Sequence, residues 1–280
     1  MPHDRSRGEP TAPDPLPVPV VDNHTHLDIS REGEEVDVAA ALAAARSVGV
    51  DRVVQIGCDL PGARFTVEQV DRHAAMLGGV ALHPNEAPRL AQSGELRHAL
   101  AEIEALATPP RIRVIGETGL DYYRTGPEGV AAQQDSFRWH IDLAKRTGKP
   151  LQIHDRDSHD DVLRILDEEG APEVTVLHCF SGDIGFAREA ADRGYLLSFA
   201  GTLTFKNAQS LRDALSVVPL GQVLLETDAP YLTPTPWRGA TNAPFLLPLT
   251  VRVAAGVLGV SVPELCGVVS DTSERVYGPW

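Results

Sequence analysis

The sequence predicts an α/β fold, a single-domain (β/α)8 TIM barrel, on three observations. Eight short apolar runs recur along the 280 residues, longer helical patterns separate them, and several of those patterns end at a glycine. Apolar runs without polar alternation are typical of parallel strands that are buried on both faces. Eight strands that are each followed by a helix predict a closed barrel. An open doubly wound sheet is the alternative that the strand count leaves open.

The expected strands are rich in Val, Ile and Leu and span residues 18–21, 52–56, 79–82, 113–115, 151–153, 174–177, 195–199 and 223–225. The expected helices span residues 36–48, 65–77, 96–107, 130–145, 160–168, 184–192 and 208–217, and two more follow at 245–258 and 263–276. Glycine often stops a helix, and here it follows helical patterns at Gly49, Gly78, Gly148, Gly170 and Gly194. Residues 1–17 hold five prolines and several charges, so we expect a disordered leader before a barrel domain of residues 18–280.

The composition restricts the class of protein. The net charge of −14 disfavours broad, non-specific binding to nucleic acid, although bound metal ions could still attract a phosphate. No apolar run reaches the ~18 residues of a membrane span, and the N-terminus lacks the apolar segment of a signal peptide. We therefore expect a cytoplasmic protein without membrane contact, and a monomer by default. The three cysteines form no CxxC pair, which argues against a disulfide framework or a zinc site built from thiolates, and we interpret Cys179 as a small buried hydrophobe.

Polar residues gather at the predicted carboxyl ends of the strands, which meet at one mouth of a barrel, where active sites are built. A single histidine at a strand end is more often structural, but five of the ten histidines lie at such ends, together with carboxylates. Neutral imidazoles and carboxylates are suitable ligands for a divalent metal. The strand-end residues are Asp22, His24, His26, His83, Glu117, His154, His178 and Asp228. The other histidines, for which we expect surface or packing roles, are His3, His73, His98, His140 and His159.

Seven stretches, in order, give the chain a recognisable likeness. They are VDNHTHLD at 21–28, ALHPNEA at 81–87, IGETGLDYY at 115–123, LQIHDR at 151–156, LHCFSGD at 177–183, GTLTFKNA at 201–208 and ETDAPYLTPTPWRGATNAP at 226–244. With these stretches the sequence resembles the TatD family of metal-dependent hydrolases, often called TatD-type DNases, within the amidohydrolase-like barrels. The likeness covers nearly the whole folded region.

The resemblance implies a role for each matched position. His24 and His26 would bind a first metal that Asp228 completes, Glu117 would bridge two metals, and His154 and His178 would bind the second. The implied substrate-binding residues are His83, Tyr123, Arg156 and Arg238, with Asn242 orienting the last loop. The chain departs from the family pattern at Asn85, Ala240, Thr241 and Ala243. These departures concern substrate binding, and none of them changes an implied metal ligand.

These residues lead us to expect two divalent ions, Mg²⁺, Mn²⁺ or Zn²⁺, and a metal-bound hydroxide as the nucleophile. Asp228 would also serve as the general base, beside the bridging Glu117. The activity that the resemblance implies is that of a phosphodiesterase, an exonuclease-type deoxyribonuclease acting on DNA or RNA ends. The alternative is a hydrolase of small amides, esters or lactones on the same barrel. A binding protein without activity is the least favoured, because all six implied ligands are present.

Overall fold

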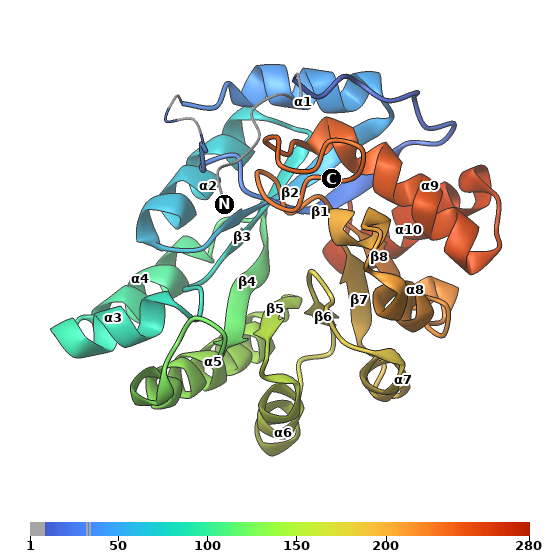
Figure 1. The fold of residues 1–280 in the computed structure, drawn as a ribbon. Helices are drawn as coiled ribbons and strands as arrows, with labels where there is room; N and C mark the ends of the chain where they lie inside the picture. Colours follow the sequence, from blue (N-terminus) through green and yellow to red (C-terminus); the bar gives the residue numbers. More distant parts are fainter. Residues whose placement is uncertain (1–8, 32, 34) are drawn as a thin grey trace.

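The computed structural model describes residues 9–31, 33 and 35–280, and it confirms the predicted (β/α)8 barrel (Figure 1). Eight parallel strands lie in sequence order around the centre, and helices surround them. The strands are β1 (Val20–Thr25), β2 (Val50–Gly57), β3 (Met76–Val80), β4 (Ile112–Asp121), β5 (Leu151–Arg156), β6 (Thr175–Leu177), β7 (Leu196–Phe199) and β8 (Val223–Leu225). The α-helices are α1 (Val38–Ser47), α2 (Leu60–Arg72), α3 (Glu86–Ser93), α4 (Leu96–Leu106), α5 (Pro127–Thr147), α6 (His159–Glu169), α7 (Ile184–Asp192), α8 (Gln209–Leu215), α9 (Leu247–Leu258) and α10 (Val262–Tyr277). Three short 3₁₀ helices, η1 (Gly201–Thr204), η2 (Leu220–Gln222) and η3 (Pro244–Leu246), complete the chain.

Backbone hydrogen bonds join the first and last strands and close the barrel. Beyond the end of β8, the backbone N–H of Asp228 donates to the carbonyl of His24 at 3.0 Å, and the N–H of His26 donates to the carbonyl of Ala229 at 2.8 Å. A buried carboxylate adds to this seam, since Asp22 accepts from the N–H of Thr227 at 2.9 Å and from its hydroxyl at 2.5 Å. The closure therefore brings the His24 and His26 segment directly against the Asp228 segment.

Two of the predicted elements have different bounds in the structure. The helix expected at 65–77 is α2, which begins at Leu60 and ends at Arg72, so Met76 and Leu77 belong to β3. Gly78 is a strand residue and not a helix stop: a Cβ atom there would lie 2.6 Å from a methyl group of Thr66, so close packing of α2 on β3 requires glycine. An apolar run shared by a helix end and a strand start carries no internal signal for the boundary.

The folded region also begins before residue 18. Residues 9–17 form no helix or strand, yet Leu16 is buried and its N–H donates to the carbonyl of Val48 at 2.9 Å. The guanidinium of Arg252 donates to the carbonyl of Asp14 at 2.8 Å. The last residues of the expected leader are thus packed on the barrel. Residues 1–8 lie outside the described residues.

Local signals explain where several helices start and stop. Side chains of Asp59, Asp183 and Ser261 accept a hydrogen bond from the first turn of α2, α7 and α10. Gly148 ends α5 with a φ of 63°, a left-handed conformation that glycine adopts without steric cost. These caps define where the helices end and the neighbouring loops begin.

The barrel has an apolar floor and a polar mouth. Val54, Leu77, Val114 and Leu224 fill the inside with other buried side chains, and Tyr277 of α10 packs against this cluster. Among the described residues no single helix is long and apolar enough to cross a membrane, whereas Pro244–Leu258 and Val262–Tyr277 pass that test only as a pair bent by 107°.

Candidate active site

Glu117 of β4 is the centre of the polar mouth. Its side chain is buried, with a residue exposure of 3%. One carboxylate oxygen, Oε2, lies 3.5 Å from His24 Nε2 and 3.7 Å from His26 Nε2. The other, Oε1, lies 2.6 Å from His154 Nδ1 and 2.8 Å from His178 Nε2. A single carboxylate thus faces two separate pairs of imidazoles, contributed by β1 and by the ends of β5 and β6.

Asp228 adds a second carboxylate on the His24 and His26 side. Its Oδ1 lies 3.3 Å from His26 Nε2. The residue has a φ of 53°, in the left-handed region that non-glycine residues rarely adopt. The hydrogen bond from its N–H to the carbonyl of His24 holds it there. Such backbone conformations persist where the surrounding structure imposes them, and they cluster at functional sites.

The spacing of these donor atoms suits a divalent ion on the first side. Two ligands at 2.0–2.2 Å from one ion, at angles near 90–110°, lie roughly 2.8–3.6 Å apart. The nitrogens of His24 and His26 are 3.2 Å apart, and the contacts of His26 with Asp228 and of His24 with Glu117 measure 3.3 and 3.5 Å. The second side is tighter, because His154 and His178 contact Glu117 directly, and an ion there would need these groups to separate by a few tenths of an ångström. The donor set fits two borderline divalent ions.

The remaining nitrogen of each histidine has a partner that orients the ring. His24 Nδ1 lies 2.8 Å from Gln152 Oε1, and His26 Nδ1 lies 2.9 Å from the carbonyl of Ile56. Both partners are acceptors, so each Nδ1 carries a proton, and each Nε2 is directed at a carboxylate, where it can hold a second proton or bind a metal ion. Hydrogen bonds of this kind fix the tautomer of metal-binding histidines.

On the second side of Glu117, carboxylates orient the rings of His178 and His154. His178 Nδ1 lies 3.2 Å from Glu226 Oε1, and Glu226 is held by the N–H of Cys179 at 2.8 Å and the hydroxyl of Ser198 at 2.5 Å. His154 Nε2 lies 3.3 Å from Asp121 Oδ2, as an ion pair without an aligned hydrogen bond. These contacts leave His178 Nε2 and His154 Nδ1 directed at Glu117.

The site attracts positive charge. Burial alone would raise the pKa of Glu117, but the charges of nearby histidines and hydrogen bonds from His154 and His178 lower it well below its usual range. Burial opposes the charging of His26, yet its contacts with Asp228 and Glu117 raise its pKa to about 10. The pKa of His178 is likewise raised well above its usual value by Glu117 and Glu226, against the effect of burial. Protons on these rings occupy the place that a bound cation would take, because metal ligation requires neutral imidazole.

A cavity of about 800 Å³ lies over this cluster and is lined by residues from loops all around the mouth. It contains His83, whose Nε2 lies 3.5 Å from Glu117 Oε1, and Arg156. Of the other two residues expected to bind substrate, Tyr123 lies beside the cavity with its ring under the Arg156 guanidinium, 3.8 Å from the ring centre. Arg238 lies over the Phe205 ring at 3.9 Å and is not a lining residue.

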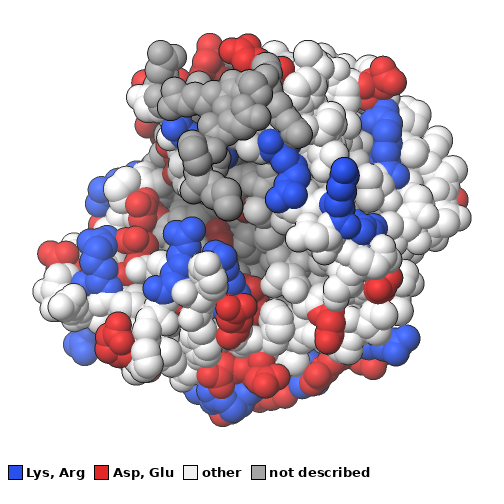
Figure 2. Space-filling view, in the orientation of Figure 1, with Lys and Arg blue, Asp and Glu red and all other residues white. Residues whose placement is uncertain are grey.

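The cavity has two arginines on one side and uncharged side chains on another. Arg124 follows β4 and Arg156 is the last residue of β5, whereas Thr202, Ala208 and Leu211 belong to the segment from η1 to α8 after β7. Neither arginine forms an ion pair with a carboxylate of the described residues, unlike many arginines on the outer helices. Figure 2 shows Lys and Arg side chains along part of the edge of a central hollow.

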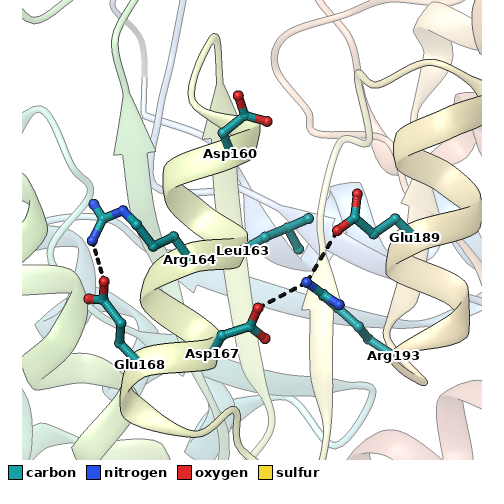
Figure 3. A pocket seen from close by; sticks show the side chains of 7 residues that line it. All are labelled: Asp160, Leu163, Arg164, Asp167, Glu168, Glu189 and Arg193. Atoms are coloured by element: carbon teal, nitrogen blue, oxygen red, sulfur yellow. Dashed lines mark hydrogen bonds and ion pairs between the residues drawn. The ribbon is translucent and has the colours of Figure 1, made fainter.

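A second hollow lies on the outside of the barrel, between α6 and α7 (Figure 3). The charged side chains that line it pair with one another: Arg164 with Glu168, and Arg193 with Asp167 and Glu189. Exposed pairs of this kind contribute about 0–1 kcal/mol each, and we assign them a structural role.

Sequence reasoning missed four residues of the mouth: Gln152, Asp121, Glu226 and Cys58. Glu226 and Cys58 follow the ends of β8 and β2, the same position that indicated the other site residues. Asp121 was hidden because β4 continues to that residue, beyond the predicted end at 115. Cys179 lines the cavity and is only partly buried, so it is not simply a core hydrophobe, and burial and nearby carboxylates raise its thiol pKa well above the usual value.

Comparison with known proteins agrees with this geometry. The profile of the family described as TatD related DNase matches residues 21–278. This chain belongs to that TatD family. An uncharacterized metal-dependent hydrolase, TatD of Mycobacterium tuberculosis (strain ATCC 25618 / H37Rv), is 43% identical over 263 residues, which cover 92% of this chain and 98% of the relative. The uncharacterized metal-dependent hydrolase YcfH of Escherichia coli (strain K12) is 37% identical over 260 residues, covering 92% and 95%.

Solved structures support the fold of this TatD family member. The TatD homologue YJJV from Escherichia coli K12 superposes with a TM-score of 0.85 at 23% identity, over 93% of this chain and 98% of that chain. A TatD family hydrolase from Entamoeba histolytica gives a TM-score of 0.82 at 19% identity, over 95% and 100%. The chain is therefore a metal-dependent hydrolase of the TatD family with candidate metal-binding residues at the mouth of its barrel.

Proposed function

We propose that this protein is a phosphodiesterase that removes nucleotides from the ends of DNA or RNA, using two divalent ions. The observation that carries the proposal is Glu117, whose two carboxylate oxygens face two separate sets of donors under an open cavity. His24, His26 and Asp228 would hold the first ion, and His154 and His178 the second, with Glu117 shared. Two such ions stabilise the attacking and leaving oxygens of a phosphoryl transfer and supply a nucleophilic water near neutral pH.

The protein's own groups would bind the phosphate and move the proton. Arg156 and Arg124 line one side of the cavity and lack carboxylate partners, so they favour an anionic group near Glu117. A guanidinium can donate two parallel hydrogen bonds to phosphate oxygens. The Asp228 carboxylate, whose side chain is 13% exposed, lies beside His26 and can accept a proton from the attacking water.

An exposed aromatic ring supports a nucleotide as the substrate. Tyr123 is 64% exposed, an unusual exposure for a large apolar side chain of this protein, and it lies next to Arg156. In proteins that bind single-stranded nucleic acid, bases stack on aromatic side chains without sequence preference. A cavity of about 800 Å³ is small compared with a duplex, so we expect a free strand end to reach Glu117, which favours exonuclease action.

End-labelled single-stranded DNA and RNA, incubated with the metal-loaded protein, test the proposal. We expect stepwise shortening from one end, dependent on added Mg²⁺, Mn²⁺ or Zn²⁺ and abolished by chelation. A covalently closed circle of the same DNA is the matched control and should stay intact. Cleavage of the circle, or no cleavage of either substrate by protein that holds two ions, would contradict the proposal.

A hydrolase of small amides, esters or lactones is the second candidate. The neutral side of the cavity, with Ala208, Leu211 and Leu232, and the net charge of −14 favour a small substrate. A panel of such substrates, assayed with the same metal-loaded protein, distinguishes the two functions. The identity of the ions, a cytoplasmic location and a monomeric state stay predictions.

A further inference from the structure

Cys58 lies against the candidate metal site and has no place in the proposed function so far. It follows the end of β2 and lines the cavity. Its sulfur donates a hydrogen bond to Glu117 Oε2 at 3.2 Å. It also lies 3.7 Å from His26 Nδ1, the ring nitrogen that faces the carbonyl of Ile56. Glu117 Oε2 is the carboxylate oxygen that faces His24 and His26, so the thiol is on the first-ion side of Glu117.

The distance between the thiol sulfur and the carboxylate oxygen suits a shared ion. A sulfur at about 2.3 Å and an oxygen at 2.0–2.2 Å from one ion, at angles near 90–110°, are roughly 3.0–3.7 Å apart. The observed separation of 3.2 Å between Cys58 Sγ and Glu117 Oε2 lies in that range. His26, Cys58 and Glu117 also form one compact group of donor atoms within 4.8 Å of one another.

We propose that Cys58 is a further ligand of the first ion, beside His24, His26, Glu117 and Asp228, and that it makes this position selective for zinc over magnesium. The thiol's hydrogen bond uses a lone pair of Glu117 Oε2 that a bound ion would take. The sulfur would then bind the ion as thiolate and release its proton to the solvent in the cavity. Thiolate ligands select zinc, whereas magnesium prefers oxygen ligands alone.

The inference rests on the metal-binding part of the proposed function and does not depend on the substrate. It also differs from a zinc site of cysteines alone, which the sequence argues against, because a single thiolate here joins imidazoles and carboxylates. A merely structural thiol, one that only holds Glu117 in place, would give no spectroscopic sign of a sulfur–metal bond.

Cobalt(II) substitution in the full chain tests whether Cys58 binds the first ion. Cobalt bound by thiolate absorbs in the near ultraviolet, and cobalt bound only by nitrogen and oxygen does not. The chain has three cysteines, so the double variant Cys179→Ser/Cys266→Ala keeps Cys58 as its single thiol. We expect the thiolate–cobalt band in the wild type and in this double variant, and its loss in Cys58→Ser. We also expect Cys58→Ser to weaken zinc binding at least about tenfold while magnesium affinity stays unchanged.

The possible outcomes separate a failure of this inference from a failure of the proposed function. Protein that holds cobalt without the band, or a band that persists in Cys58→Ser, overturns the inference and leaves the proposed function standing. Protein that binds no cobalt at all contradicts the proposed function as well. If Cys58→Ser does not fold, by circular dichroism, the double variant alone gives the answer, because its only possible thiolate ligand is Cys58.

Discussion

Asp228 combines two properties that the other residues of the mouth do not share. Its carboxylate contacts His26 at 3.3 Å, in the first set of donors, and it is more exposed than Glu117. Its positive φ and the hydrogen bond from its N–H to His24 fix the direction of the side chain. Glu117 is committed to both sets of donors, so Asp228 is the carboxylate best placed to accept a proton.

Asp228→Asn should lower kcat by about 10²–10⁴ while the metal content stays nearly unchanged. Asparagine tolerates the left-handed backbone conformation and keeps a carbonyl oxygen, but it cannot act as a base. His24, His26 and Glu117 remain to hold the first ion. The measurement is kcat at saturating metal together with metal analysis of the purified variant. Full activity would show that this carboxylate is not the base, and parallel loss of metal and activity would make it a ligand first.

Arg156 is the residue for which a substrate effect without a metal effect is expected. Hydrogen bonds to charged groups contribute about 1.5–3 kcal/mol, so Arg156→Ala should lower kcat/KM for a phosphodiester roughly 10–100-fold, mostly through KM. Arg164→Ala, on the outer face of α6, removes the same charge away from the cavity and should have no effect. Equal effects of both variants would mean that only the net charge matters.

The helix α5 contributes a buried histidine that ties it to the loop after β3. His140 Nδ1 donates to the carbonyl of Ser136 at 2.7 Å, and its Nε2 accepts from the N–H of Leu82 at 3.2 Å. The hydrogen bond from Leu82 requires the neutral ring, because a protonated Nε2 would face another N–H. Burial accordingly lowers the pKa of His140 to about 4. This contact supports the segment that carries His83.

The lowered pKa of His140 predicts that the free energy of unfolding falls in acid. The unfolded chain protonates His140 near pH 6.5, whereas the folded protein resists protonation until about pH 4. The contribution is therefore complete above pH 6.5 and is lost as the pH falls, by about 2–3 kcal/mol between pH 7 and pH 4.5. Denaturant unfolding of the wild type and His140→Asn at both pH values isolates this effect. The free energy of unfolding should fall less in the variant, and equal falls would exclude His140 as a cause.

The whole barrel brings together donors from five of its strands or their ends, so metal binding should stabilise the entire molecule. A ligand at 100 times its Kd stabilises the folded state by about 2.7 kcal/mol, roughly 5–10 °C in Tm for a chain of this size. We expect up to two divalent ions per chain and a rise of this order when zinc or manganese is added to stripped protein.

Single variants should empty the two positions separately. His154→Ala removes a donor of the second set and should leave one ion, while His24→Ala should deplete the first position. Metal analysis and thermal unfolding of both variants check this. Unchanged metal content in both would refute the assignment of these histidines as ligands.

Much of the architecture could be predicted from residue pattern alone. All eight strands were located, because strands buried on both faces require continuous apolar runs. The helix α3 and the boundary between α2 and β3 were missed, since short or merged apolar segments have no distinct periodicity. The six candidate ligands could be named because they lie at or beyond the carboxyl ends of the predicted apolar runs, and a barrel gathers these ends at one mouth.

The sequence by itself determined the barrel, the family and the identity of the candidate ligands, because these depend on periodicity and on motifs that lie along the chain. Only the tertiary structure decided which oxygen of Glu117 faces which histidines, and that Gln152, Asp121 and Glu226 orient the rings. It also decided that Cys58 contacts Glu117, a residue 59 positions away. Contacts between separate strands depend on barrel closure and on side-chain direction, and no local pattern in the chain encodes either.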